Sequence, residues 1–303
     1  MRSHGPSDSI PANARGAAIA LGNFDGVHRG HQAVIASARA QGGKLGVALF
    51  SPHPRGFFQP DAAPFRLQSD AQRARALTAC GVDELFEVRF DAALSQMGDA
   101  AFARKVLCEH FGVRHVSVGA DYRFGHRRMG DAARLAALGR ELGFSVSAVT
   151  AVEGDDGRFS STAVREAIAA GAMDKAATVL SRPWAIEGVV QRGFQRGRGF
   201  GFATANVPLG AYARPRLGIY AVRANLDGVL LPGVASIGVN PSVGALPEPL
   251  LETHIFDFDA ELYGKTIEVE IIAFLRDEAH FTDVEALKAQ MADDAARARA
   301  ILA

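Results

Sequence analysis

The sequence predicts an α/β protein with two domains: a parallel sheet covered by helices, then a small antiparallel barrel with a C-terminal helix. Up to about residue 181, short apolar runs alternate with amphipathic ones, a pattern typical of right-handed crossovers between parallel strands. From Ile186 to Leu275, frequent turn signals separate short β-rich runs, which favours a barrel. We therefore expect a disordered tail at 1–16 and domains at 17–181 and 182–303.

Composition excludes several classes of partner. Lys plus Arg and Asp plus Glu both number 33, so no net charge attracts nucleic acid or an anionic membrane. No apolar stretch is long enough to span a bilayer, and the first residues lack the apolar region of a secretory signal. The two cysteines, Cys80 and Cys108, fit no CxxC pattern and indicate a reducing compartment. The expected location is the cytoplasm.

The elements of the first domain follow from runs and start signals. Strands are expected at the apolar runs 17–21, 45–50, 85–88, 113–118 and 144–149. Helices are expected from about His31, after the capping residues Asp70, Asp99 and Asp131, and after the polar cluster 160–162. In parallel sheets ligands bind beyond the carboxyl ends of strands, so the loops that follow the strands deserve inspection.

The loop after the first strand reads "GNFDGVHRGH" and spans residues 22–31. Glycines, an aspartate and two histidines suit a loop that wraps a charged ligand at a strand-to-helix junction. His28 and His31 are three residues apart, so both can face a phosphate from the N-terminal end of a helix. A zinc site and a glycine-rich turn with incidental histidines are the alternatives, but the full string favours phosphate chemistry.

Two further stretches of the first domain carry unusual polar residues. The second strand is followed by "SPHPRGFF", and the fourth by "GADYRFGHRRMGD". Ser161 and Thr162 precede the helix "AVREAIAAG" and cap it in the simplest interpretation. A capped N-terminus also offers backbone amides to an anion, with Arg165 one turn further on.

The second domain opens with a glycine-rich loop, "GFQRGRGFG" at 193–201, followed by "FATANV". Its glycines allow close approach of a polyphosphate, although the ending of a P-loop is absent and a flexible hairpin is the alternative. Thr204 and Asn206 supply oxygen atoms suited to magnesium shared with substrate phosphates. In "LETHIFDF", alternation places Glu252, His254, Phe256 and Phe258 on one face, and Glu252 is either at a solvated strand end or a general base.

Eight motifs in order resemble one family, the bacterial bifunctional riboflavin kinase/FMN adenylyltransferases (FAD synthetases). The first half is similar to its Rossmann-like nucleotidyltransferase module through "GNFDGVHRGH", "FSPHP", "VGADYRFG" and "SSTAVR". The second half is similar to its riboflavin kinase module through "GRGFGFATANV", "GVASIGVNPSVG", "LETHIFDFDAELYGK" and "FLRDEAHF". The resemblance implies phosphorylation of riboflavin to FMN by one ATP and adenylylation of FMN to FAD by a second, with ATP as co-substrate and Mg²⁺ as cofactor. No expectation for the oligomeric state follows from it.

The resemblance also implies roles for individual residues. In adenylyl transfer, the implied catalytic residues are His28, His31 and Arg165, and the implied ATP and phosphate ligands are Gly22, Asn23, Phe24, Asp25, Gly30, Asp121, Ser161 and Thr162. In the kinase, ATP is expected at Gly193, Gly197, Arg198, Thr204 and Asn206, the last two also holding Mg²⁺. The flavin is expected at Arg276, Glu278 and Phe281. Glu252 becomes the favoured base for the ribityl hydroxyl.

One departure from the family falls in the kinase signature, where Ala203 replaces the proline of "GFPTAN". Loss of proline is expected to cost about 0.4 to 1 kcal/mol through backbone entropy. Two alternative functions follow: an adenylyltransferase with an impaired kinase module, or a non-catalytic flavin-binding regulator. The last helix, with apolar residues at Val284, Leu287, Met291, Ala295 and Ala298, is expected only to pack against the barrel.

Overall fold

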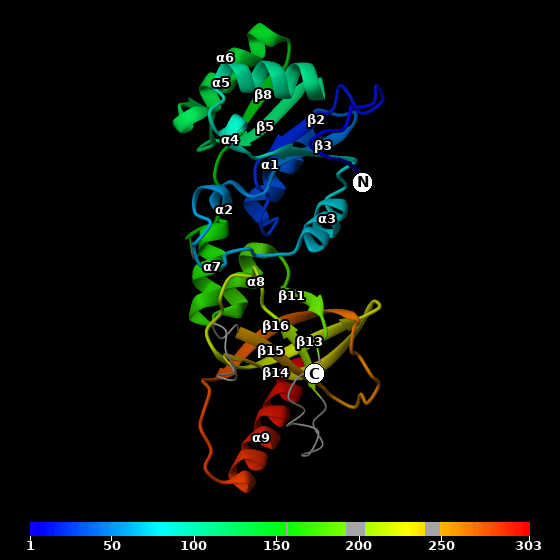
Figure 1. Ribbon diagram of the computed structural model, residues 1–303, viewed down its shortest axis with the longest axis vertical. Coiled ribbons are helices and arrows are strands. Elements are labelled where there is room, and N and C mark those ends of the chain that lie inside the picture. Colours follow the sequence, from blue (N-terminus) through cyan, green and yellow to red (C-terminus); the bar gives the residue numbers. More distant parts are fainter. Residues whose placement is uncertain (156, 192–203, 240–248) are drawn as a thin grey trace. The chain divides into compact units, whose positions relative to one another are not determined.

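Parallel strands form the sheet of the first half in the computed structural model, which describes residues 1–155, 157–191, 204–239 and 249–303 (Figure 1). The order is β1-β4-β3-β2-β5-β8, and all five pairs are parallel. The strands are β1 (Arg2–His4), β2 (Ala18–Leu21), β3 (Leu45–Ser51), β4 (Glu84–Arg89), β5 (His115–Gly119) and β8 (Ser145–Val149). The predicted parallel α/β sheet is confirmed.

Helices cover both faces of this sheet, because successive strand residues point to opposite sides. Ile19 and Leu21 pack in a cluster with Leu135 of α6, whereas Ala20 packs in another with Ile35 of α1. The helices are α1 (Arg29–Arg39), α2 (Pro54–Phe58), α3 (Asp70–Ala79), α4 (Ala92–Ser95), α5 (Asp99–Phe102), the π-helix η1 (Ala103–Phe111), the 3₁₀ helix η2 (His126–Arg128) and α6 (Ala132–Leu142). Two-residue strands also form, namely β6 (Arg123–Phe124), β7 (Gly130–Asp131), β9 (Glu153–Gly154) and β10 (Gly157–Arg158).

The N-terminal residues correct one expectation. Residues 2–4, expected in a disordered tail, form β1 and pair with β4 along the edge of the sheet. Arg2 Nη2 and His4 Nε2 reach the buried carboxylate of Glu84, at 2.5 and 2.9 Å. This strand lacks an apolar pattern, so its partner distant in the sequence, and not local propensity, orders it.

Antiparallel strands form the barrel of the second half in the order β11-β16-β13-β14-β15-β12. A bridge between Gln191 and Asn206 joins its two edges. The strands are β11 (Trp184–Val189), β12 (Thr204–Pro208), β13 (Gly218–Leu226), β14 (Val229–Val239), β15 (Pro249–Ile255) and β16 (Thr266–Arg276). The helices are α7 (Ser161–Ala170), α8 (Met173–Leu180) and α9 (Val284–Leu302). The predicted barrel with a C-terminal helix is confirmed.

Helix α9 lies against the outside of the barrel. Ala298 is buried in a small cluster with Ala221, Phe256 and Leu275, as the helical spacing predicts. Val284 is exposed, so its predicted place in the packed stripe is wrong. The first turn of α9 extends past the barrel core, and the buried face begins later in the helix.

The chain divides into two compact units: residues 1–62 with 73–160, and residues 63–72 with 161–303. The predicted boundary at 181 therefore does not coincide with the division of the fold, because α8 packs against β11 and β16. The indole of Trp184 also donates a hydrogen bond to the Leu67 carbonyl, at 2.9 Å, which ties segment 63–72 to the barrel.

None of the helices in the described ranges combines the length and hydropathy of a membrane span.

Candidate active sites

The loop 22–31 occupies the position where the strand order of the first unit reverses. From β2 the chain proceeds through β3 and β4 on one side, whereas β5 and β8 lie on the other. Ligands of open parallel sheets bind at such a reversal, outside the carboxyl ends of the strands. The same edge carries the start of the loop after β5, which contains Asp121.

His28 and His31 come together at the start of α1. His28 is the N-cap residue, and its Nδ1 accepts a hydrogen bond from the backbone N–H of His31, at 3.3 Å. The two imidazole rings stack with centroids 3.6 Å apart and planes 24° apart. The Phe24 ring lies 5.1 Å from that of His31. Both imidazoles therefore lie beside the N-terminal end of α1, where anions are stabilised.

The backbone of this loop is strained. Phe24 and Val27 have φ values of 53° and 43°, and Gly26 between them has a φ of 91°. Left-handed backbone costs energy for residues other than glycine and persists where packing over-determines it. Phe24 and Val27 are both buried, as are Asp25 and His28. The packing of these buried residues therefore holds the strained loop in one preformed conformation beside the helix terminus.

Three more residues of the loop have identifiable structural roles. Gly22 donates its N–H to the Ala48 carbonyl, at 3.1 Å, and so fixes the loop to β3. A Cβ on Gly30 would lie 2.8 Å from the Phe159 carbonyl oxygen, so only glycine fits there. The buried Oδ1 of Asn23 has no hydrogen-bond partner within the part of the chain that the structure describes. Since an unsatisfied buried acceptor is costly, this atom is suited to a donor from a ligand.

The loop after β5 contains two neighbouring polar residues, Asp121 and Tyr122. Asp121 forms a salt bridge with Arg158, at 2.7 Å. Next to it, burial raises the pKa of Tyr122, and the Tyr122 hydroxyl lacks a hydrogen-bond partner among the described residues. The sequence indicates no role for Tyr122, which stands between two charged residues; only the structure shows its ring stacked on Phe124, with centroids 5.9 Å apart.

Ser161, Thr162 and Arg165 belong to the second unit, in the first turns of α7. The Nε of Arg165 donates to the Phe65 carbonyl, at 2.8 Å, and its guanidinium lies 5.6 Å from the Phe65 ring centroid. Their expected role in adenylyl transfer remains a prediction.

The barrel brings the expected kinase residues of β12 and β15 side by side. Asn206 lies directly opposite Glu252, and Thr204 lies opposite His254. Opposed residues of antiparallel strands point to the same face, so these four side chains share one face. Asn206 is buried, and its Nδ2 donates to the Thr204 carbonyl, at 3.3 Å. A carboxylate, a hydroxyl and an amide thus belong to one face of the barrel, and their roles in the kinase reaction remain predictions.

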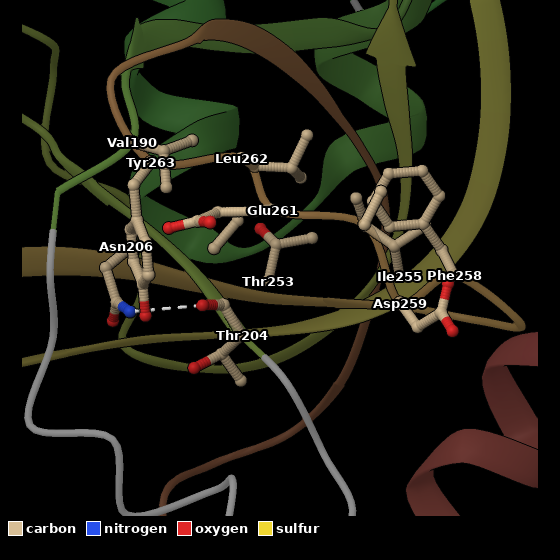
Figure 2. A pocket seen from close by; sticks show the side chains of 12 residues that line it. Val190, Thr204, Asn206, Thr253, Ile255, Phe258, Asp259, Glu261, Leu262 and Tyr263 are labelled. Carbon is tan, nitrogen blue, oxygen red and sulfur yellow. Dashed lines mark hydrogen bonds between the residues drawn. The ribbon is translucent and has the colours of Figure 1, made fainter.

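A pocket adjoins Thr204 and Asn206, and Figure 2 shows the side chains that line it, which include neither Glu252 nor His254. Thr204 and Asn206 form part of its wall, and the segment after β15 forms another part with Asp259, Glu261 and Tyr263. The remaining lining residues are Val190, Ala205, Thr253, Ile255, Phe258, Ala260 and Leu262. The sequence indicates no role for residues 259–263, which begin four residues after the end of the strand that carries Glu252.

The alternation predicted for "LETHIFDF" holds only to the end of β15. Glu252 and His254 are half-buried on one face, while Thr253 and Ile255 are buried on the other. The strand ends at Ile255, and Asp257 has a φ of 56°, which breaks the period of two. The expectation that Phe256 and Phe258 continue the face of Glu252 is therefore wrong; Phe256 packs in the cluster beneath α9.

The expected flavin residues lie together at the end of β16. Arg276 is the last residue of that strand, and Glu278 and Phe281 follow in the connection to α9. The Arg276 guanidinium carbon lies 6.0 Å from the Phe281 ring centroid. Gly193, Gly197 and Arg198, and also Ala203, lie outside the described residues.

No group of three or more His, Cys, Asp or Glu side chains that could hold a metal ion occurs within the described ranges.

Comparisons with known proteins match both halves of the chain. A FAD synthetase family model matches residues 10–163, and a riboflavin kinase family model matches residues 180–302. A bifunctional riboflavin kinase/FMN adenylyltransferase from Pseudomonas fluorescens is 42% identical over 95% of this chain and 94% of its own length. One from Escherichia coli K12 is 40% identical, with 95% and 93% covered. A crystal structure described as a macrolide-efflux protein from Streptococcus pneumoniae has a TM-score of 0.85 at 28% identity, covering 97% of each chain.

Proposed function

Because the chain belongs to the bifunctional riboflavin kinase/FMN adenylyltransferase family, we propose that it converts riboflavin to FMN and FMN to FAD, with ATP as co-substrate of both reactions. Both modules are present, and the 95% coverage of the chain by these relatives supports both activities. The stacked His28 and His31 at the N-terminus of α1 are the structural observation that carries the adenylyl-transfer half.

In adenylyl transfer, an oxygen of the FMN phosphate attacks the α-phosphorus of ATP, and the bond from that phosphorus to the bridging oxygen of the β-phosphate breaks. Pyrophosphate leaves, and the attacking phosphate oxygen has no proton that a base must remove. His31 and His28 donate hydrogen bonds to the phosphate oxygens on which charge accumulates, aided by the backbone amides of α1. The rigid backbone around Gly26 keeps these donors in place before substrate binds.

In the kinase module, the ribityl 5′-hydroxyl of riboflavin attacks the γ-phosphorus of ATP and ADP leaves. Glu252 accepts the hydroxyl proton as the new oxygen–phosphorus bond forms. Its position opposite Asn206 supports this role, since the base and the phosphate-binding residues then share one face of the barrel.

Mg²⁺ fits the donors that β12 offers. Thr204 and Asn206 are oxygen-bearing side chains beside a half-buried carboxylate, and hard cations prefer such ligands. These two residues would hold the ion together with phosphate oxygens of ATP. When bound, Mg²⁺ neutralises charge on the transferring phosphoryl group. We place the enzyme in the cytoplasm, in keeping with a sequence that has only two cysteines, Cys80 and Cys108, and no CxxC pattern.

Purified protein incubated with riboflavin, ATP and Mg²⁺, followed by chromatographic separation of flavins, tests the proposal. FMN should appear first and FAD later. A parallel incubation with FMN in place of riboflavin separates the two modules, because FAD formed from FMN but never from riboflavin would indicate adenylyl transfer alone. Absence of both products with oxidised and reduced flavin would refute the proposal.

A further inference from the structure

Helix α9 carries a buried carboxylate that lies outside the residues assigned to either reaction. Asp294 is 3% exposed, although the helix around it has charged and exposed residues. An ionised carboxylate at this depth requires compensation by charge and hydrogen bonds. From the sequence alone, α9 was expected only to pack against the barrel.

Arg276 supplies that compensation in a two-point geometry. Its Nη2 donates to Asp294 Oδ2 at 2.6 Å, and its Nε donates to Oδ1 at 2.9 Å. Gln290, one turn earlier on α9, donates to Oδ1 at 3.2 Å. Because the guanidinium is planar, two parallel contacts fix its plane as well as its position.

The same guanidinium lies at the start of the expected flavin segment. Its Nη1 donates to the Asp277 carbonyl at 2.9 Å, and its carbon lies 6.0 Å from the Phe281 ring centroid. The Asp277 carboxylate is in turn held by Arg216, at 2.7 and 2.8 Å. The beginning of the connection between β16 and α9 is thus anchored by two charge pairs, one buried and one exposed.

We propose that Asp294 is a positioning residue for riboflavin: it fixes the guanidinium of Arg276 and neutralises its charge. This inference rests on the proposed kinase function, in which Arg276, Glu278 and Phe281 receive the flavin. The ring system of riboflavin is uncharged, so a guanidinium that meets it gains from hydrogen bonding and stacking, not from net charge. An Arg276 without Asp294 would keep its contact with the Asp277 carbonyl but would rotate among several rotamers.

The variant Asp294→Asn tests this, because asparagine keeps the volume and removes the charge. We expect the KM for riboflavin in the kinase reaction to rise about tenfold, as the loss of a charge-assisted contact predicts. The KM for ATP and kcat should stay within about twofold, since none of the residues assigned to ATP in the kinase belongs to α9. Riboflavin binding measured by flavin fluorescence should weaken in parallel.

The matched control is Asp257→Asn. Asp257 binds Arg299 of the same helix at 2.9 and 3.1 Å, but its side chain is 78% exposed. Asp257 also attaches α9 to the barrel, but through Arg299 near the end of the helix and not through the expected flavin residues Arg276, Glu278 and Phe281. Its removal should leave both KM values unchanged, so a general loosening of α9 is distinguished from a specific effect at Arg276.

The outcomes separate this inference from the proposed function. If the unaltered protein makes no FMN from riboflavin, the proposed function fails before any variant is compared. If it makes FMN and Asp294→Asn leaves the riboflavin KM unchanged, the inference is overturned. If Asp294→Asn unfolds, Asp294→Glu keeps the carboxylate but displaces it by one methylene, so the two-point contact is lost while Arg276 itself is unchanged; a selective rise in riboflavin KM then supports the inference, and no change or an equal loss for both substrates overturns it.

Discussion

Replacing Glu84 with glutamine is expected to loosen the edge strand β1 of the first unit. The Glu84 side chain is 1% exposed and receives contacts from three cationic or hydrogen-bonding groups. His4 Nε2 lies 2.9 Å from Oε2, while Arg2 Nη2 and Lys44 Nζ lie 2.5 and 3.3 Å from Oε1. Glutamine keeps the shape of this side chain but replaces one acceptor by a donor and removes the charge.

The magnitude follows from how exposed each partner is. Arg2 and Lys44 are 52% and 38% exposed, so their ion pairs are screened and add little. The buried contact with His4 dominates, and a hydrogen bond to a charged group contributes about 1.5 to 3 kcal/mol. We therefore expect Glu84→Gln to lower the stability of the first unit by about 2 kcal/mol, or its Tm by about 4 to 8 °C.

The loss should depend on pH with a defined sign. Burial raises the pKa of Glu84, but hydrogen bonds from His4, Arg2 and Lys44 outweigh burial and hold the pKa below its ordinary value of 4.5. A carboxylate with a lowered pKa stabilises the fold above its unfolded pKa and loses this effect as pH falls through the folded value. The difference between Glu84→Gln and the unaltered protein should be complete at neutral pH and shrink below pH 4.5.

Hydrogen exchange of β1 and β4, read by mass spectrometry, measures this unit separately. The fluorescence of the single tryptophan, Trp184, reports the unfolding of the other unit, whose stability the substitution should leave unchanged. Glu87→Gln is the matched control. Glu87 is half-buried on the same strand, but its contact with β1 is a single long hydrogen bond from Ser3 Oγ, at 3.5 Å. Equal protection in Glu84→Gln and Glu87→Gln at neutral pH would refute the reasoning.

Two further substitutions probe the two units. Gly30→Ala would place a Cβ 2.8 Å from the Phe159 carbonyl and 3.1 Å from the His28 ring, so FAD formation from FMN should fall by about tenfold or more while FMN formation persists. Gly56→Ala, where a Cβ meets nothing within 4 Å, is its control, and equal FAD rates would contradict the assignment. Thr253→Val removes a buried hydroxyl that lacks a partner within the described residues, so urea unfolding followed by Trp184 fluorescence should show about 1 kcal/mol of added stability; a lower midpoint would argue against this.

The sequence predicts the elements of the first unit well where local signals are strong. Apolar runs placed all five expected strands, and Asp131 caps α6 as predicted. β1 escaped prediction because its order comes from Glu84, far along the chain. The helix after the first strand begins at Arg29, with His28 as its cap, because the histidine side chain itself accepts the N-terminal hydrogen bond.

Contacts distant in the sequence limited the prediction of the sites. The motif residues His28 and His31 were expected to face one ligand, and the structure adds their stacking and the strained backbone at Phe24 and Val27, which no propensity reveals. The role of Asp294 was missed because a charged residue is usually solvated, although its spacing from Met291 and Ala298 places it on the buried face of the helix. Only the fold brings Arg276 to it.

The central claim is that one chain carries two phosphate-transfer reactions at separate sites. Rates of FMN formation from riboflavin and of FAD formation from supplied FMN, measured for His31→Ala and Glu252→Ala, test it most directly. We predict that His31→Ala lowers FAD formation by about 100-fold or more and spares FMN formation. Glu252→Ala should lower FMN formation by a similar factor and spare FAD formation. Loss of both activities in either variant, with the fold intact, would contradict the claim.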